Sequence, residues 1–198
     1  MNKAFAIDLF RQTLSAPRAA ADRIMGLDLP RRWLWTALAL MGVLNGIVYS
    51  LFLQVGGPPD PGTTPLIPPA LQSPALFTMF LLGALVITVM TLTWVGKAMG
   101  GKAEVPQILA LIAWLQVLRL AVQLALLVLM LALPLAGLVL VVVASVWGLV
   151  ILVVFIDRAH GFENIFKAVA VIILAFLGML IGLSAFLGVL ATLVMGGA

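Results

Sequence analysis

Long apolar stretches alternate with short polar breaks along most of this chain. A bilayer core of about 30 Å requires about 20 apolar residues of helix, and five stretches reach that length. They cover residues 33–53, 74–95, 106–131, 135–156 and 165–194. The pattern predicts an all-α fold, a polytopic transmembrane helix bundle of about five spans, with residues 33–198 as its transmembrane domain.

Four breaks separate the predicted spans. Six prolines lie between residues 56 and 74, which excludes helix and favours an extended loop. Residues 96–105 and 157–167 combine charges with glycine and are predicted to be polar turns. The fourth break carries no charge. Pro134 and Gly137 predict a tight hairpin there, because the apolar run that contains them is about twice too long for one span.

Residues 1–32 are predicted to be a short amphipathic helical segment. Its apolar side chains recur at helical spacing and are Phe5, Leu9, Phe10 and Leu14. Ser15 is the predicted cap of a second short helix, with Pro17 in its first turn and Gly26 at its end. The segment either lies in the membrane interface or packs on the ends of the bundle, and the two arrangements are compatible.

The basic residues predict how the chain is threaded. Ten of the eleven Lys and Arg residues fall on one side of the predicted spans: Lys3, Arg11, Arg18, Arg23, Arg31, Arg32, Lys97, Lys102, Arg158 and Lys167. Cytoplasmic loops carry such an excess, so we expect a cytoplasmic N-terminus and, after five spans, a C-terminus outside. We expect a multi-pass protein of the inner (plasma) membrane, and the composition favours a bacterial source.

Composition narrows the classes of function. The chain is 64% hydrophobic and 9% charged, with a mean hydropathy of +1.26, so no sizeable soluble domain is expected. Nucleic-acid binding is not expected, because basic binding patches need a polar surface. The absence of cysteine excludes disulfides, thiolate nucleophiles and zinc–cysteine sites.

Arg119 is the one basic residue inside a predicted span. Gln116 and Gln123 lie three residues before and four after it, so the three share one helix face, which we expect to point into the bundle. A charge there costs at least about 2.5–3.5 kcal/mol. The face is a candidate polar pocket, lipid-headgroup contact or anion path. Alternatively, Arg119 is satisfied by the glutamines, by Asn45 or by carbonyls near Pro134, or it snorkels to the interface.

No pattern predicts a catalytic, cofactor-binding or metal-ligating site, and we expect a protein that is not an enzyme and needs no cofactor. No Asp or Glu lies inside a span to pair with Arg119, which disfavours a proton-coupled pump. The single histidine, His160, falls in a predicted polar turn with Asp157 and Glu163. Their spacing does not support metal ligation, and a solvated turn is the expectation.

Small residues recur at a spacing of four inside the spans. Such pairs let helices approach closely in lipid. The pairs Gly42 and Gly46, and Gly178 and Gly182, are the candidate packing residues, and Ala144 with Gly148 is a further pair. Packing within the bundle is the first expectation for them, and self-association is the second.

Three short motifs resemble the Yip family, the Ypt/Rab-interacting-protein-like membrane proteins, in its short bacterial form. They are Ser15-Ala16-Pro17-Arg18, Gly100-Gly101-Lys102, and His160-Gly161-Phe162 continuing to Lys167-Ala168. The Asp-Leu-Tyr-Gly-Pro element of eukaryotic members is missing, which argues against a Rab-type GTPase partner. The resemblance implies a non-enzymatic role in membrane organisation or trafficking.

Two functions from different classes therefore stay open. The first is a membrane-organising or assembly protein that binds lipid and other membrane proteins or itself. The alternative is a small transporter or channel that uses the polar face of Gln116, Arg119 and Gln123 together with Asn45. A lipid-acting enzyme would need clustered acids or histidines at the interface, and only residues 157–163 come near.

Overall fold

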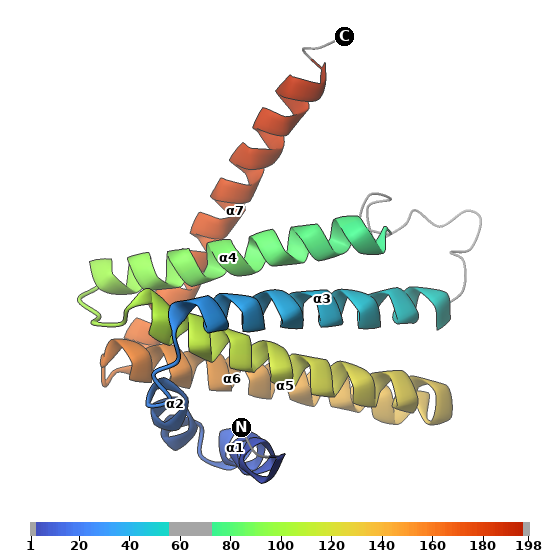
Figure 1. Ribbon diagram of the computed structural model, residues 1–198, viewed down its shortest axis with the longest axis horizontal. Coiled ribbons are helices and arrows are strands. Elements are labelled where there is room, and N and C mark those ends of the chain that lie inside the picture. Colours follow the sequence, from blue (N-terminus) through green and yellow to red (C-terminus); the bar gives the residue numbers. More distant parts are fainter. Residues whose placement is uncertain (1–2, 56–72, 196–198) are drawn as a thin grey trace.

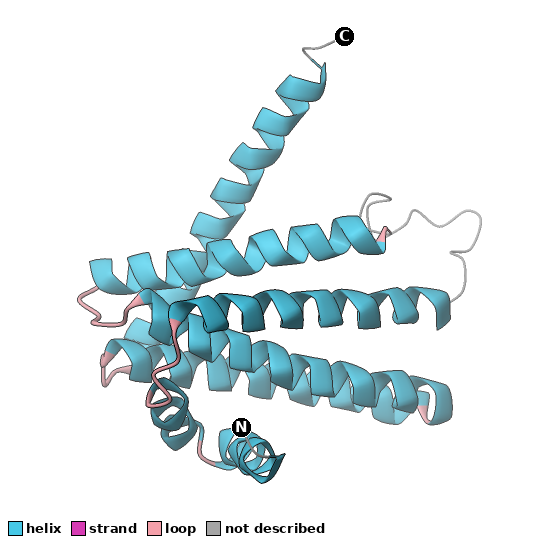
Figure 2. Cartoon of the chain, in the orientation of Figure 1, coloured by secondary structure: helices cyan, strands magenta, loops and turns pink. Residues whose placement is uncertain are grey.

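A computed structural model describes residues 3–55 and 73–195, and its described elements are all helices (Figure 2). The seven helices are α1 (Lys3–Ser15), α2 (Pro17–Met25), α3 (Arg31–Val55), α4 (Pro74–Ala98), α5 (Val105–Ala132), α6 (Pro134–His160) and α7 (Ile165–Met195). The predicted proline-rich loop and the last three residues lie outside the described residues.

Helices α3 to α6 run side by side along one axis, and α7 starts against them and then diverges from α4 (Figure 1). Helix α3 packs on α5 and α4, while α7 packs on α4 and α6. The short helices α1 and α2 lie outside this bundle, near one of its ends, and α2 contacts α6 and α5. The fold is thus a helix bundle with a two-helix N-terminal attachment.

The predicted fold class is confirmed, since five helices are long and apolar enough to cross a membrane. Helices α3 to α7 contain 25 to 31 residues. At 1.5 Å per residue they exceed the hydrocarbon thickness of about 30 Å. Their ends therefore project beyond the hydrocarbon or the helices tilt.

The uncharged break before α6 is a single residue. Helix α5 ends at Ala132, Leu133 connects, and Pro134 opens α6, a position where proline needs no amide hydrogen bond. Gly137 is buried one turn later, and a Cβ there would lie 3.1 Å from Sδ of Met130. The absence of a side chain lets the two helices approach at the hairpin.

Arg23 joins α1 to α2. Its guanidinium donates hydrogen bonds to Asp8 (2.5 Å) and Gln12 (2.9 Å) and lies 4.3 Å above the ring centroid of Phe5. The predicted cap at Ser15 is wrong: its hydroxyl donates to the carbonyl of Arg11 in its own helix, because a hydroxyl inside a helix can bond one turn back.

Gly42 and Gly46 face α4 from α3. A Cβ on Gly42 would overlap the end of the Leu82 side chain, and a Cβ on Gly46 would overlap Oγ1 of Thr78. Both glycines therefore make room for α4. Near the same end, the rings of Tyr49 and Phe77 stack with their centroids 3.7 Å apart.

Candidate functional site

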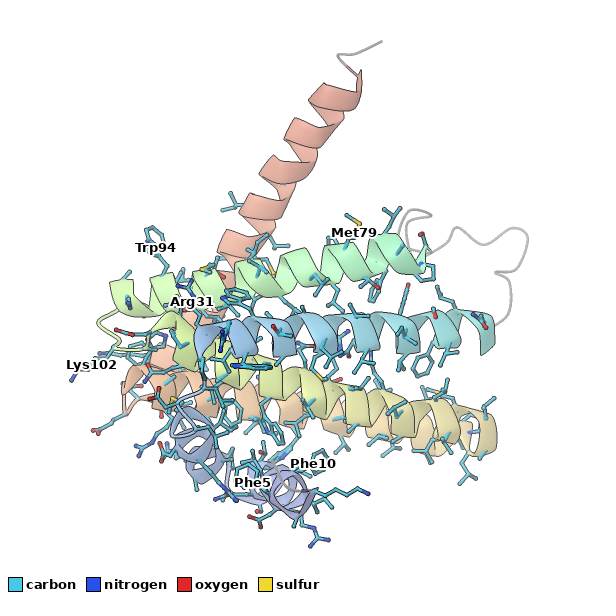
Figure 3. All side chains as sticks on the ribbon, in the orientation of Figure 1. Phe5, Phe10, Arg31, Met79, Trp94 and Lys102 are labelled. Carbon is cyan, nitrogen blue, oxygen red and sulfur yellow. The ribbon has the colours of Figure 1, made fainter. Side chains whose placement is uncertain are left out.

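The charged residues gather at one end of the bundle, which we call the basic end. Here α4 turns into α5 and α6 turns into α7, and Lys97, Lys102, Arg158 and Lys167 lie in or beside these two turns. Figure 3 places Lys102 and Trp94 at this end and Met79 towards the opposite end. Trp94 is 77% exposed, as expected for an interfacial aromatic side chain.

His160 is the buried centre of the basic end. It is the last residue of α6 and is 1% exposed. A Cβ on Gly96 or on Gly101 would overlap its imidazole, so these two glycines form the walls of its pocket. On a further side its ring stacks on Phe162, with centroids 5.1 Å apart and an angle of 16°.

The main chain around His160 ties the two turns together. The amide of Lys102 donates a hydrogen bond of 3.1 Å to the carbonyl oxygen of His160. The backbone of Gly100 and of Gly161 is in the left-handed region, with φ of +86° and +64°. Glycine adopts this conformation at a lower energetic cost than any residue with a side chain. The glycines thus serve both the reversal of each turn and the close approach between them.

Two ion pairs attach α2 to the end of α6. The guanidinium of Arg158 donates to Asp22 at 2.7 Å, and Arg18 lies 3.7 Å from Asp157. Asp157 is buried and also accepts a hydrogen bond of 3.0 Å from the amide of Asn164. Its carboxylate therefore fixes the α6–α7 turn and faces α2 at the same time.

The prediction of a solvated turn at Asp157 and His160 is wrong. Helix α6 continues through both residues and ends at His160, with Gly161 as its C-cap, and both side chains are buried. The physical reason is packing against α2 and the α4–α5 turn, which a hydropathy pattern does not register. In the part of the chain that the structure describes, no three His, Asp or Glu side chains are placed to hold a metal ion.

The predicted polar face is divided between two environments. Gln116 is buried, and its backbone oxygen lies 3.5 Å from Nδ2 of Asn45, which is fully buried on α3. Asn45 also donates to the carbonyl of Met41 at 2.7 Å. Within the described structure, Oδ1 of Asn45 and Oε1 of Gln116 accept no hydrogen bond. These two side chains point into the bundle.

Arg119 does not follow Gln116 into the bundle, which corrects the expectation for this residue. It is exposed and lines a cavity of about 700 Å³ between α5, α6 and α1, and Gln123 lines the same cavity. Two side chains that lie three positions apart on a helix, such as Gln116 and Arg119, differ by roughly 60° in direction. That difference is enough to place one on the inner side of α5 and the other on its outer side. Among the described residues Arg119 has no hydrogen-bond or ion-pair partner.

The other small-residue pairs differ in surroundings. A Cβ on Gly178 would lie 3.9 Å from Cγ2 of Thr91, which is an ordinary van der Waals contact. A Cβ on Gly182 would meet no described atom within 4 Å. Ala144 and Gly148 line the cavity, and a Cβ on Gly148 would meet no atom within 4 Å. This last pair forms the floor of a groove, where packing between helices was the first expectation.

Sequence reasoning missed the residues that dock the N-terminal helices. Nε1 of Trp114 on α5 donates to Oγ1 of Thr13 on α1 at 2.9 Å, and Thr13 is fully buried. The pairing of Asp22 with Arg158 was likewise not predicted. Each of these residues fits its own helix pattern, so only the tertiary arrangement reveals the contact.

Comparison with known families gives one match. The model of the family described as the Yip1 domain matches residues 11–197, which include the end of α1, all of α2 and all five long helices. No curated protein and no solved structure is found to match the chain.

Proposed function

The chain belongs to the Yip1-domain family of proteins and is a multi-pass helical membrane protein, and from this premise we propose that it is a non-enzymatic membrane-organising or assembly component. Its working surface is the basic end, where α2 and the two turns meet. Its partners are lipid and other membrane proteins, or further copies of the chain.

The observation that carries the proposal is the convergence of the three family-like motifs. The segment at Arg18, the turn at Gly101 and Lys102, and the segment that starts at His160 are far apart in sequence. The amide of Lys102 donates a hydrogen bond to the carbonyl oxygen of His160, and Arg18 forms an ion pair with Asp157, three residues before His160. Glycines and buried groups hold this junction in one conformation. A recognition surface needs such a fixed conformation, and an ordinary loop does not have one.

The direction of the basic end completes the proposal. An excess of Lys and Arg on one side favours the cytoplasm, so we place α1, α2 and both turns there, with the C-terminus outside. We assign the protein to the inner (plasma) membrane of a bacterial cell. The exposed Trp33 and Trp94, at 59% and 77%, would then lie near the inner interface.

The geometry favours this role over transport. A transport path along the polar face would need Gln116, Arg119 and Asn45 to line one passage. Instead Gln116 and Asn45 are enclosed between α3 and α5, while Arg119 lines a cavity bounded by the outer sides of α5 and α6. Transport would be favoured if Arg119→Leu abolished solute flux in vesicles while insertion stayed intact.

Site-specific crosslinking in native membranes tests the proposal. A photoreactive amino acid replaces Lys102 or Lys97, which are exposed at the basic end, and Met79, which is 69% exposed towards the other end, serves as the matched control. We expect the two lysine positions to capture the same protein, Met79 not to capture it, and an excess of the unlabelled chain to compete for it.

Undocking α2 supplies a second control. Arg158→Glu places a second carboxylate beside that of Asp22, and it should reduce the capture of the partner by the photoreactive group at position 102. Arg158→Asp combined with Asp22→Arg re-forms an ion pair in the opposite direction and should restore that capture. Identical sets of captured proteins from Lys102 and Met79 would overturn the assignment of the surface, as would capture that does not respond to undocking.

A further inference from the structure

An apolar groove with one cation lies on the outer side of the bundle. It has a volume of about 700 Å³ and is lined by α5 and α6, with Phe10 and Leu14 of α1 at its rim. This volume is in the range of small-molecule sites, which are mostly apolar with few polar groups. Arg119 is the only charged residue among the residues that line it.

The contact between α1 and α5 shows how far along the groove Arg119 lies from the headgroup side. Helix α1 crosses α5 at Trp114, whose indole donates to Thr13. Arg119 follows five residues later, about 7.5 Å further along the helix. Its long side chain can reach the level of α1 by snorkelling, and α1, an amphipathic helix, marks the headgroup side of the membrane.

The groove continues away from the cation as an apolar channel. Beyond Arg119 it is lined by Val122 and Leu126 on α5 and by Leu140 and Ala144 on α6. Gly148, one turn from Ala144 towards the basic end and so about level with Arg119, has open space where a side chain would be. A cationic end near the interface and an apolar remainder directed into the membrane match one phospholipid, headgroup to acyl chain.

Among the residues that the structure describes, no acidic side chain forms an ion pair with Arg119. Its seven acidic residues are Asp8, Asp22, Asp28, Asp60, Glu104, Asp157 and Glu163. By their positions in the sequence, all seven fall outside the five predicted apolar spans, so neither this chain nor a second copy is expected to offer a carboxylate within the span beside Arg119. An unpaired cation in a membrane is costly, and a lipid phosphate can accept two hydrogen bonds from one guanidinium.

From these observations we propose that the groove between α1, α5 and α6 binds one anionic glycerophospholipid, with its phosphate on Arg119 beside Gly148 and an acyl chain over Val122 and Ala144. Gln123 lines the same groove, and its buried Oε1 accepts no hydrogen bond from the described residues. This site does not depend on the role proposed for the basic end.

Native mass spectrometry of the full-length chain tests the site. The purified protein is equilibrated in mixed micelles with dioleoyl phosphatidylglycerol or with dioleoyl phosphatidylcholine, and the retained lipids are counted. We expect one phosphatidylglycerol to be retained more tightly than phosphatidylcholine. Arg119→Gln should weaken that retention by about tenfold, because it removes charge-assisted hydrogen bonds. Arg119→Lys should keep most of it.

Matched variants separate the groove from general surface effects. Gly148→Leu should fill the groove and release either lipid, while Gly83→Leu makes the same change at an exposed glycine of α4 that also has open space around it and should release neither. Arg31→Gln removes a positive charge at the start of α3 and should not change the count.

Three results would overturn the proposal. They are unchanged retention in Arg119→Gln, unchanged retention in Gly148→Leu, and equal retention of the two lipids by the unmodified chain. Competition by inorganic phosphate alone, without loss on filling the groove, would also reject a lipid site. Only variants whose unfolding temperature equals that of the unmodified chain are compared. If Gly148→Leu is unstable, Ala144→Leu replaces it.

Discussion

The imidazole of His160 occupies the space that a side chain on Gly96 would need. Gly96 is buried on α4, and His160 is buried at the end of α6, so the contact joins two helices that are far apart in sequence. Nδ1 and Nε2 of the ring lie buried, and the only polar group of the described structure that acts on the ring as a hydrogen-bonding neighbour is the backbone of Leu92 on α4. The basic end is therefore held by shape as well as by charge.

Gly96→Ala should destabilise the protein. The new methyl group overlaps the imidazole, and overpacking of this kind costs about 1–3 kcal/mol. Thermal unfolding in detergent measures the change. Gly83→Ala, at an open position on the same helix, is the control and should change little. His160→Ala added to Gly96→Ala should recover part of the loss, and the absence of any recovery would contradict the contact.

Asp157→Ala should cost more stability than Asp157→Asn. Alanine leaves the amide of Asn164 without its 3.0 Å acceptor, and an unsatisfied buried donor costs about 1–3 kcal/mol. Asparagine keeps an oxygen at that position and loses only the charge facing Arg18. Comparing the unfolding midpoints of the two variants measures the difference. Equal midpoints would mean that the hydrogen bond does not stabilise the turn.

The two glycines of α3 should tolerate alanine to different degrees. On Gly42 the new methyl group meets the flexible end of Leu82, which can rotate away. On Gly46 it meets Thr78, a stiff β-branched residue whose hydroxyl is bonded to the carbonyl of Pro74. We expect Gly46→Ala to lower the unfolding temperature more than Gly42→Ala. Thr78→Ala should reduce that gap, and the reverse order would exclude this account of the α3–α4 contact.

The buried amides of Asn45 and Gln116 offer a test of structure against transport. Each has an oxygen without a described donor, and hydrogen bonds between membrane helices average only about 0.6 kcal/mol. The double change Asn45→Leu with Gln116→Leu should therefore leave the unfolding free energy unchanged or raise it, as measured by denaturant titration. A loss of several kcal/mol would show that buried water or another group completes the pair.

The fold was predictable because lipid imposes a simple rule on sequence. Each long helix contains a run of about 20 apolar residues, and the prolines and charges between the runs mark where helices end. The hairpin at Leu133 was predictable from length together with Pro134. The continuation of α6 through Asp157 and His160 was not predictable from the sequence. These polar residues are helical because α2 and the α4–α5 turn cover them, and those contacts exist only in the folded structure.

The candidate site was less predictable than the fold. Helical spacing predicted one shared face for Gln116, Arg119 and Gln123, but it could not decide which neighbours surround residues that differ by roughly 60° in direction. The structure places α3 beside Gln116 and a groove beside Arg119. Likewise, Gly101 and His160 were each noticed as part of a motif, but their contact depends on the positions of four helices.

The single connecting residue between α5 and α6 has a consequence for biogenesis. Leu133 offers the translocation machinery no charged or hydrophilic segment to export, and residues 120–156 contain no Lys, Arg, Asp or Glu. The two helices can therefore enter the bilayer together as a preformed hairpin. The direction in which that hairpin inserts is left to the charges on its two outer flanks.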